Sequence, residues 1–89
     1  MARHLSAMKR ARQNEKRRLR NQSRKTRVKN VVRQVRQAVD QKNPAEAQTA
    51  LQSAIPVLAR VASKGTLHWR TAARKISRLT RQVNALQRA

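Results

Sequence analysis

The first 43 residues of this 89-residue chain contain neither glycine nor proline. These two residues are the strongest local interruptions of regular structure, so nothing breaks the chain before Pro44. The segment is rich in Arg, Lys, Gln, Ala, Leu and Met, which are mostly good helix formers. We therefore expect one long helix over about residues 6–41, spanning roughly 54 Å at about 1.5 Å per residue.

A second helix is predicted over residues 44–63. Asn43 can cap its start, and Pro44 suits the first helical position. Pro56 lies inside the segment, and we expect a kink there instead of an end, because the apolar pattern continues across it. Apolar residues recur at a spacing of three and four: Ala47, Ala50, Leu51, Ala54, Ile55, Leu58, Val61 and Ala62.

A third helix is predicted over about residues 67–87. Lys64 and Gly65 are typical of a helix C-terminus, with the glycine in the left-handed conformation, and Thr66 is a candidate cap for the next helix. The apolar stripe of the third helix comprises Trp69, Ala72, Ala73, Ile76, Leu79, Val83 and Leu86.

The long first helix has two halves of different character. An apolar stripe begins only at Val28, whereas the few apolar residues before it form no continuous face. The fold class predicted is therefore all-α: a three-helix bundle with a long overhanging N-terminal helix. We expect one domain over residues 1–89, with a basic helical arm (1–27) and the bundle (28–89). The Arg-rich, acid-poor start of the chain is also compatible with a disordered basic arm.

Charge limits the possible partners of the chain. Lys and Arg number 23 against three Asp and Glu, which gives a formal net charge of +20. Such a body repels itself unless a polyanion neutralises it, so nucleic acid or an anionic membrane surface is expected. Arg outnumbers Lys, and because Arg binds phosphate bidentately this bias favours nucleic acid.

Two rows of cations are predicted to face a polyanion. A helical wheel aligns one row in the first helix: Lys9, Arg12, Lys16, Arg20, Arg24 and Arg27, with Arg10 and Arg17 at its margin. In the third helix the row opposite the apolar stripe consists of Arg70, Arg74, Arg78 and Arg81. The second helix has Arg60 as its only Arg, so we expect its outer face to lie toward solvent.

The sequence offers almost nothing for catalysis. It has no cysteine, three acids and two distant histidines, His4 and His68, so neither a metal site nor a general acid–base pair can be assembled. Gly65 is the single glycine, so there is no phosphate-binding glycine loop. We expect no enzyme activity, no cofactor, no metal, no small-molecule substrate and no membrane-spanning segment.

Trp69 is the sole aromatic residue among Phe, Tyr and Trp. As the first member of the third apolar stripe, it is expected to close one end of the bundle core. Base stacking is the alternative interpretation. From its position alone, the neighbouring His68 is predicted to be an exposed residue in the first turn of the helix.

Two segments closely resemble the bacterial small-subunit ribosomal protein number twenty. One is the run Ser6–Asn21, with the letters SAMKRARQNEKRRLRN; the other is KGTLH at 64–68, followed by AARK at 72–75 and SRL at 77–79. Both match in order and spacing, and the resemblance covers essentially the whole chain. Departures from the family pattern are Trp69 in place of a basic residue, Arg70 in place of Asn, and Leu5 in place of a frequent Lys.

The resemblance implies a three-helix bundle that binds small-subunit rRNA, chiefly its 5′ domain, early in assembly. It implies that the N-terminal helix reaches between rRNA segments toward the long penultimate stem. The resemblance implies that His68 contacts rRNA, in place of the earlier interpretation as an exposed residue without a role. It says nothing direct about Trp69. The rRNA contacts carried over by position are Lys9, Arg10, Lys16, Arg17, Arg20, Asn21, Lys64, His68, Arg74, Lys75 and Arg78.

The expected function is therefore a structural rRNA-binding protein of the small ribosomal subunit. It would be monomeric among other ribosomal components, in the cytoplasm of a bacterium or in an organelle of bacterial origin. The arm is expected to be poorly ordered without RNA. Two alternatives stay open: a DNA-compacting protein, which would need a dimer seam or a groove-reading helix, and a membrane-active cationic helix, which would need an exposed apolar face.

Overall fold

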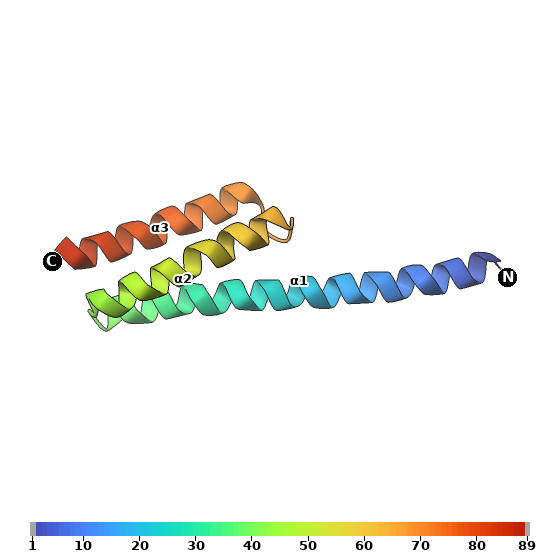
Figure 1. The fold of residues 1–89 in the computed structure, drawn as a ribbon, viewed down its shortest axis with the longest axis horizontal. Helices are drawn as coiled ribbons and strands as arrows, with labels where there is room; N and C mark the ends of the chain where they lie inside the picture. The colour runs from blue at the N-terminus through green and yellow to red at the C-terminus, as the bar shows by residue number, and fades with distance from the viewer. Residues whose placement is uncertain (1, 89) are drawn as a thin grey trace.

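The computed structural model describes residues 2–88, with side chains from residue 4 onward, and contains three helices and no strand within that range. Their bounds are Ala2–Asp40 for α1, Pro44–Ser63 for α2 and Trp69–Arg88 for α3. The helix α2 runs antiparallel to the other two, and α1 continues far beyond them toward the N-terminus (Figure 1). The predicted three-helix bundle with an overhanging first helix is confirmed.

The turn between α1 and α2 ends one helix and starts the next. Lys42 has a φ of 55°, and its N–H donates to the carbonyl of Val39 at 3.0 Å. The N–H of Asn43 donates to the carbonyl of Ala38 at 3.1 Å, which completes a Schellman arrangement. The Oδ1 of Asn43 then accepts the N–H of Glu46 at 3.2 Å, so the predicted cap of α2 is confirmed.

The connection between α2 and α3 differs from the prediction at one residue. The helix α2 continues through Pro56, and Gly65 follows the C-cap with a φ of 79°, as expected. Thr66, however, does not cap α3. His68 does: its carbonyl accepts the N–H of Ala72 at 3.0 Å, and its Nδ1 accepts the N–H of Arg70 at 3.1 Å. The third helix therefore starts at Trp69, later than predicted, and the first helix starts earlier, at Ala2.

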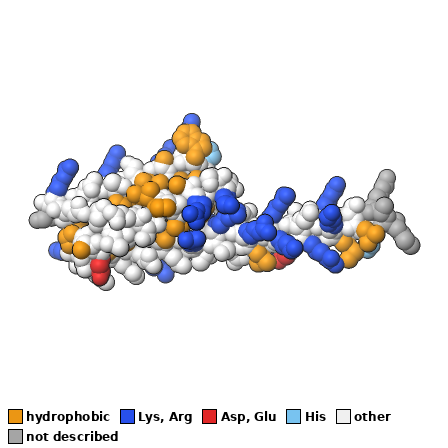
Figure 2. Space-filling view, viewed as in Figure 1, with side chains coloured by type: hydrophobic (Ala, Val, Ile, Leu, Met, Phe, Trp, Pro, Cys, Tyr) orange, Lys and Arg blue, Asp and Glu red, His pale blue; other side chains and the backbone are white. Residues whose placement is uncertain are grey.

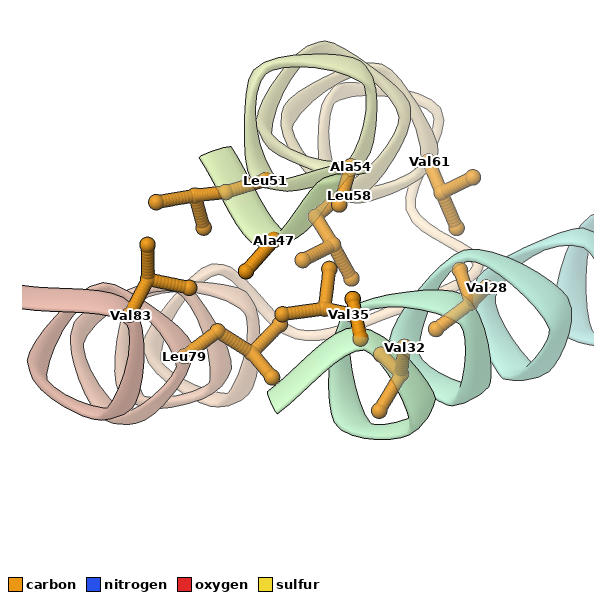
Figure 3. Packing of buried hydrophobic residues seen from close by; sticks show 11 residues of the cluster. Val28, Val32, Val35, Ala47, Leu51, Ala54, Leu58, Val61, Leu79 and Val83 are labelled. Carbon is orange, nitrogen blue, oxygen red and sulfur yellow. The ribbon is translucent and has the colours of Figure 1, made fainter. Parts of the chain in front are cut away.

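The core is purely aliphatic and lies where the three helices meet (Figure 3). Val35, Leu58 and Val83 are fully buried, and each comes from a different helix. Burying a side chain of this size contributes about 1.5–3 kcal/mol. No polar or charged residue is buried within the described range. The remaining members of the core are Val28, Val32, Ala38, Ala47, Leu51, Ala54, Val61, Ala72 and Leu79.

The N-terminal half of α1 buries nothing. Along residues 4–27 every side chain is exposed except that of Arg24, which is half-buried. The molecule consequently measures 68 × 21 × 14 Å, with a radius of gyration of 17.9 Å. A compact chain of this length would have about 12 Å. One unbroken helix thus joins a packed region to a region without a core.

Candidate nucleic-acid interface

The arm, residues 4–27 of α1, presents its cations to solvent. All of the predicted cations in it are exposed apart from Arg24. Figure 2 shows blue Lys and Arg side chains along the whole overhang, with very little red beside them. Because residues three and four apart share a helix face, the predicted row faces one side of the arm. The row is Lys9, Arg12, Lys16, Arg20, Arg24 and Arg27.

One ion pair is present among the described side chains. Arg18 Nη2 lies 2.7 Å from Glu15 Oε1, one turn apart on the exposed arm. The hydrogen bond from Arg18, together with its charge, holds the pKa of the Glu15 carboxyl below its ordinary value and raises the pKa of Arg18. Elsewhere in the described part of the chain no carboxylate pairs with a cation, so the cations are available to an external anion.

A small cationic cleft lies where the arm meets the bundle. Its volume is about 110 Å³, and Val57 and Val61 of α2 contribute apolar lining. Four cations and no acid line it, so a phosphate group fits both its size and its charge. These cations, which we call the α1–α2 cleft cluster, are Arg24, Arg27, Arg60 and Lys64.

The predicted contact residue Asn21 has a structural partner beside this cleft. Its Oδ1 accepts the hydroxyl of Thr66 at 3.1 Å, and Arg24 Nη1 donates to Thr66 Oγ1 at 3.3 Å. Thr66 therefore joins the α2–α3 loop to α1 instead of capping α3. These hydrogen bonds connect the α2–α3 loop to α1 at the base of the arm.

On the other side of α1, a groove separates it from α3. Val28 and Leu67 lie on its floor, and Lys25, Lys29 and Lys75 surround it. The groove continues along α1 past Arg33 and Arg36, and Lys75 borders both parts. Lys75 is half-buried here, so this predicted site residue faces α1 and not the outer row of α3.

The four arginines predicted to form the outer row of α3 are exposed to solvent. Arg70, Arg74, Arg78 and Arg81 are all exposed, whereas Leu79 and Val83 of the same helix are buried in the core. One side of α3 therefore packs in the core, and the opposite side presents positive charge to solvent.

The prediction that Trp69 closes one end of the bundle core is wrong. The side chain is 65% exposed, and the first buried residue of α3 is Ala72. Side chains in a helix tilt toward its N-terminus, so the indole of the first helical residue extends over the preceding loop instead of the core. There it stacks on the His68 ring at 5.8 Å between centroids, with Arg70 Cζ 5.2 Å from the indole centroid.

Sequence reasoning missed Arg60, Lys25 and Lys29. Arg60 was assigned to the solvent-facing helix, yet it lies four residues before Lys64 and shares the cleft with it. Its spacing from Lys64 was the available signal. Lys25 and Lys29 are likewise one turn apart, but only the packing of α3 against α1 turns them into the border of a groove.

Other kinds of site find no support in residues 2–88. No helix in this range has an apolar stretch long enough to cross a bilayer. No three His, Asp or Glu side chains of this range gather as metal ligands would. What the described residues do bring together is positive charge.

Comparison with known proteins identifies the family. The model of the family described as ribosomal protein S20 matches residues 2–84. The small ribosomal subunit protein bS20 of Syntrophus aciditrophicus (strain SB) is 54% identical over 85 residues, covering 96% of each chain. That of Nitratidesulfovibrio vulgaris (strain DP4) is 55% identical over 84 residues, covering 94% of this chain and 97% of the relative. That of Geobacter sulfurreducens is 46% identical over 86 residues, covering 97% and 99%. Taken with the overhanging helix and the exposed cations, these matches establish that the chain belongs to the ribosomal protein S20 family.

Proposed function

We propose that this chain is a structural component of the small ribosomal subunit, in the bacterial cytoplasm, and that it binds small-subunit rRNA directly. The observation that carries the proposal is the arrangement of charge. Cations cover the arm, the α1–α2 cleft and the outer row of α3, and one of the three acids in the chain is paired. A polyanion is the partner that such surfaces require. The protein acts as a monomer and carries out no reaction.

The cations bind by neutralising phosphates. Arg supplies two parallel N–H donors to a phosphate, and its guanidinium is more weakly hydrated than the ammonium of Lys. Phosphate contacts carry no sequence information, so in this proposal specificity comes from the shape of the RNA. The contact residues we propose are Lys9, Arg10, Arg12, Lys16, Arg17, Arg20, Asn21, Arg24, Arg27, Arg60, Lys64, His68, Arg70, Arg74, Lys75, Arg78 and Arg81.

The two parts of the molecule bind different segments of RNA. The bundle presents the outer row of α3, whereas the arm presents its cations on the part of α1 that extends beyond the bundle. A 39-residue helix is about 58 Å long, enough to contact several RNA helices where they converge. We propose that the protein stabilises such a junction within the 5′ domain of the rRNA.

Competition binding tests the proposal. The full chain is titrated with small-subunit rRNA, with and without excess duplex DNA, from low to high salt. With about 10 phosphates neutralised, log K falls with a slope of roughly −7 to −9 against log salt for either polyanion. The proposal predicts that rRNA binding survives the competitor at high salt.

Two outcomes contradict it. Equal loss of rRNA and DNA binding would mean that charge alone drives association, as in a DNA-compacting protein. Co-sedimentation with anionic liposomes that rRNA does not displace would indicate a membrane-active helix.

A further inference from the structure

We propose that Trp69 is a stacking platform for one unpaired nucleobase of the bound RNA. The inference rests on the proposed rRNA binding and adds a contact of a different chemical kind to it. The residue is 65% exposed and outside the core, so packing within the chain does not account for it. An indole offers a large flat surface on which any base can stack.

The neighbours of Trp69 hold the ring in place before RNA arrives. The His68 ring is fixed because its Nδ1 accepts the N–H of Arg70 at 3.1 Å, and the same ring stacks on the indole at an interplanar angle of 25°. The Arg70 guanidinium lies 5.2 Å from the indole centroid, within the range of a cation–π contact. A side chain that is already ordered loses less conformational entropy when it binds.

The charge around the platform favours RNA over a protein partner. Arg70 belongs both to this stack and to the outer row of α3, which continues through Arg74. A guanidinium that stacks by its face keeps its N–H edge free for phosphate. No Asp or Glu occurs anywhere after Glu46 in the chain, so the surroundings attract a phosphodiester backbone. A nucleotide can therefore place its base on Trp69 and its phosphate on the α3 row.

Intrinsic fluorescence reports on the surroundings of Trp69 alone, since Trp69 is the single Trp and the chain has no Tyr. In the free chain the exposed indole is expected to emit at long wavelength. Adding small-subunit rRNA is expected to quench the emission, because a stacked base quenches an indole. The quenching should saturate at the stoichiometry of binding measured independently by filter retention.

Matched variants test whether the aromatic surface matters. Trp69→Leu keeps an apolar side chain without a stacking face and is expected to weaken rRNA binding by roughly 5- to 150-fold at fixed salt. Trp69→Phe should retain most of the affinity. His68→Asn, which keeps a capping oxygen but removes the ring, should have an intermediate effect. Gln52→Ala, on the exposed outer side of α2, is the control and should bind like the wild type. Far-UV circular dichroism checks that each variant is folded.

The outcomes separate the two proposals. If the wild type prefers rRNA over duplex DNA but Trp69→Leu binds equally well and no quenching occurs, the stacking platform is wrong and rRNA binding stands. An indole that responds only in assembled subunits containing other proteins would assign Trp69 to a protein contact, which also overturns the platform. If the wild type shows no preference for rRNA, the proposed function itself fails.

Discussion

The two halves of α1 share one continuous helical backbone, but only the C-terminal half packs against the other helices. Residues 28–40 place Val28, Val32 and Val35 in the core, whereas residues 4–20 place no side chain against another helix. Most helical stability in proteins comes from the packing of one helix face against other elements. The bundle half is therefore stabilised by packing within the chain, whereas the arm has no such packing.

The largest difference we expect is in hydrogen exchange of the free protein. Amides of residues 28–40 exchange through global unfolding, whereas those of residues 5–20 open locally. With a stability of about 5 kcal/mol, protection in the bundle exceeds that in the arm by roughly 1,000-fold or more. Adding rRNA should slow exchange in the arm. Equal protection of both halves in the free protein would contradict the comparison.

A matched pair of leucine substitutions measures the same contrast in stability. Leu58→Ala removes a fully buried side chain and is expected to cost about 2–5 kcal/mol, much of the stability of a domain this small. Leu19→Ala removes a side chain that is 52% exposed and should change stability by less than about 0.5 kcal/mol. Urea unfolding followed by circular dichroism compares the two. A cost for Leu19→Ala close to that for Leu58→Ala would show that the arm packs after all.

Removing charge from the arm should affect rRNA binding but leave the stability of the protein unchanged. The triple variant Lys9→Gln, Lys16→Gln, Arg20→Gln is expected to leave the free energy of unfolding within about 0.5 kcal/mol of the wild type. The salt slope of rRNA binding should become shallower by roughly 2–3 units, because three phosphate contacts are lost. Lys42→Asn is the control: it lies in the α1–α2 turn, and Asn tolerates the positive φ of that position. An unchanged slope in the triple variant would exclude these three residues as phosphate contacts.

The smallest effect concerns the ion pair on the arm. The pKa of Glu15 is lowered by Arg18, so the pair stabilises the helix above the ordinary pKa of a glutamate, roughly 4.3, and this contribution is lost as pH falls through the lowered value. Arm helicity, measured by NMR chemical shifts, should therefore decrease slightly as the Glu15 carboxylate is protonated in acid. Glu15→Gln should abolish that acid dependence. An acid dependence that survives the substitution would have another origin.

Local chemistry made most of the fold predictable. Asn43, Pro44 and Gly65 act through their own backbone and side-chain preferences, so their roles follow from residue type and position alone. The start of the core at Val28 followed from spacing in the same way.

The errors arose where tertiary contacts decide. Thr66 has a good capping side chain, but its hydroxyl bonds to Asn21 of α1, and His68 takes the cap. Trp69 has the spacing of a core residue, but its place in the first turn directs it away from the core. Arg60 joins the candidate interface only because α2 packs beside Arg24 and Arg27. The spacing along α2 relates Arg60 to Lys64, but it does not show that α1 brings Arg24 and Arg27 to the same cleft.

Because the backbone of α1 is unbroken, it also fixes the direction, around the helix axis, in which the arm side chains point relative to the bundle. Each residue turns the helix by about 100°, so inserting two residues between Asn21 and Val28 would rotate every side chain of the arm by roughly 200° relative to the α3 row. The cation row of the arm would then face the opposite side of the molecule. An insertion of seven residues would nearly restore the phase but lengthen the arm by about 10 Å. The length of α1 between Asn21 and Val28 therefore sets both the distance and the rotation of the arm relative to the bundle.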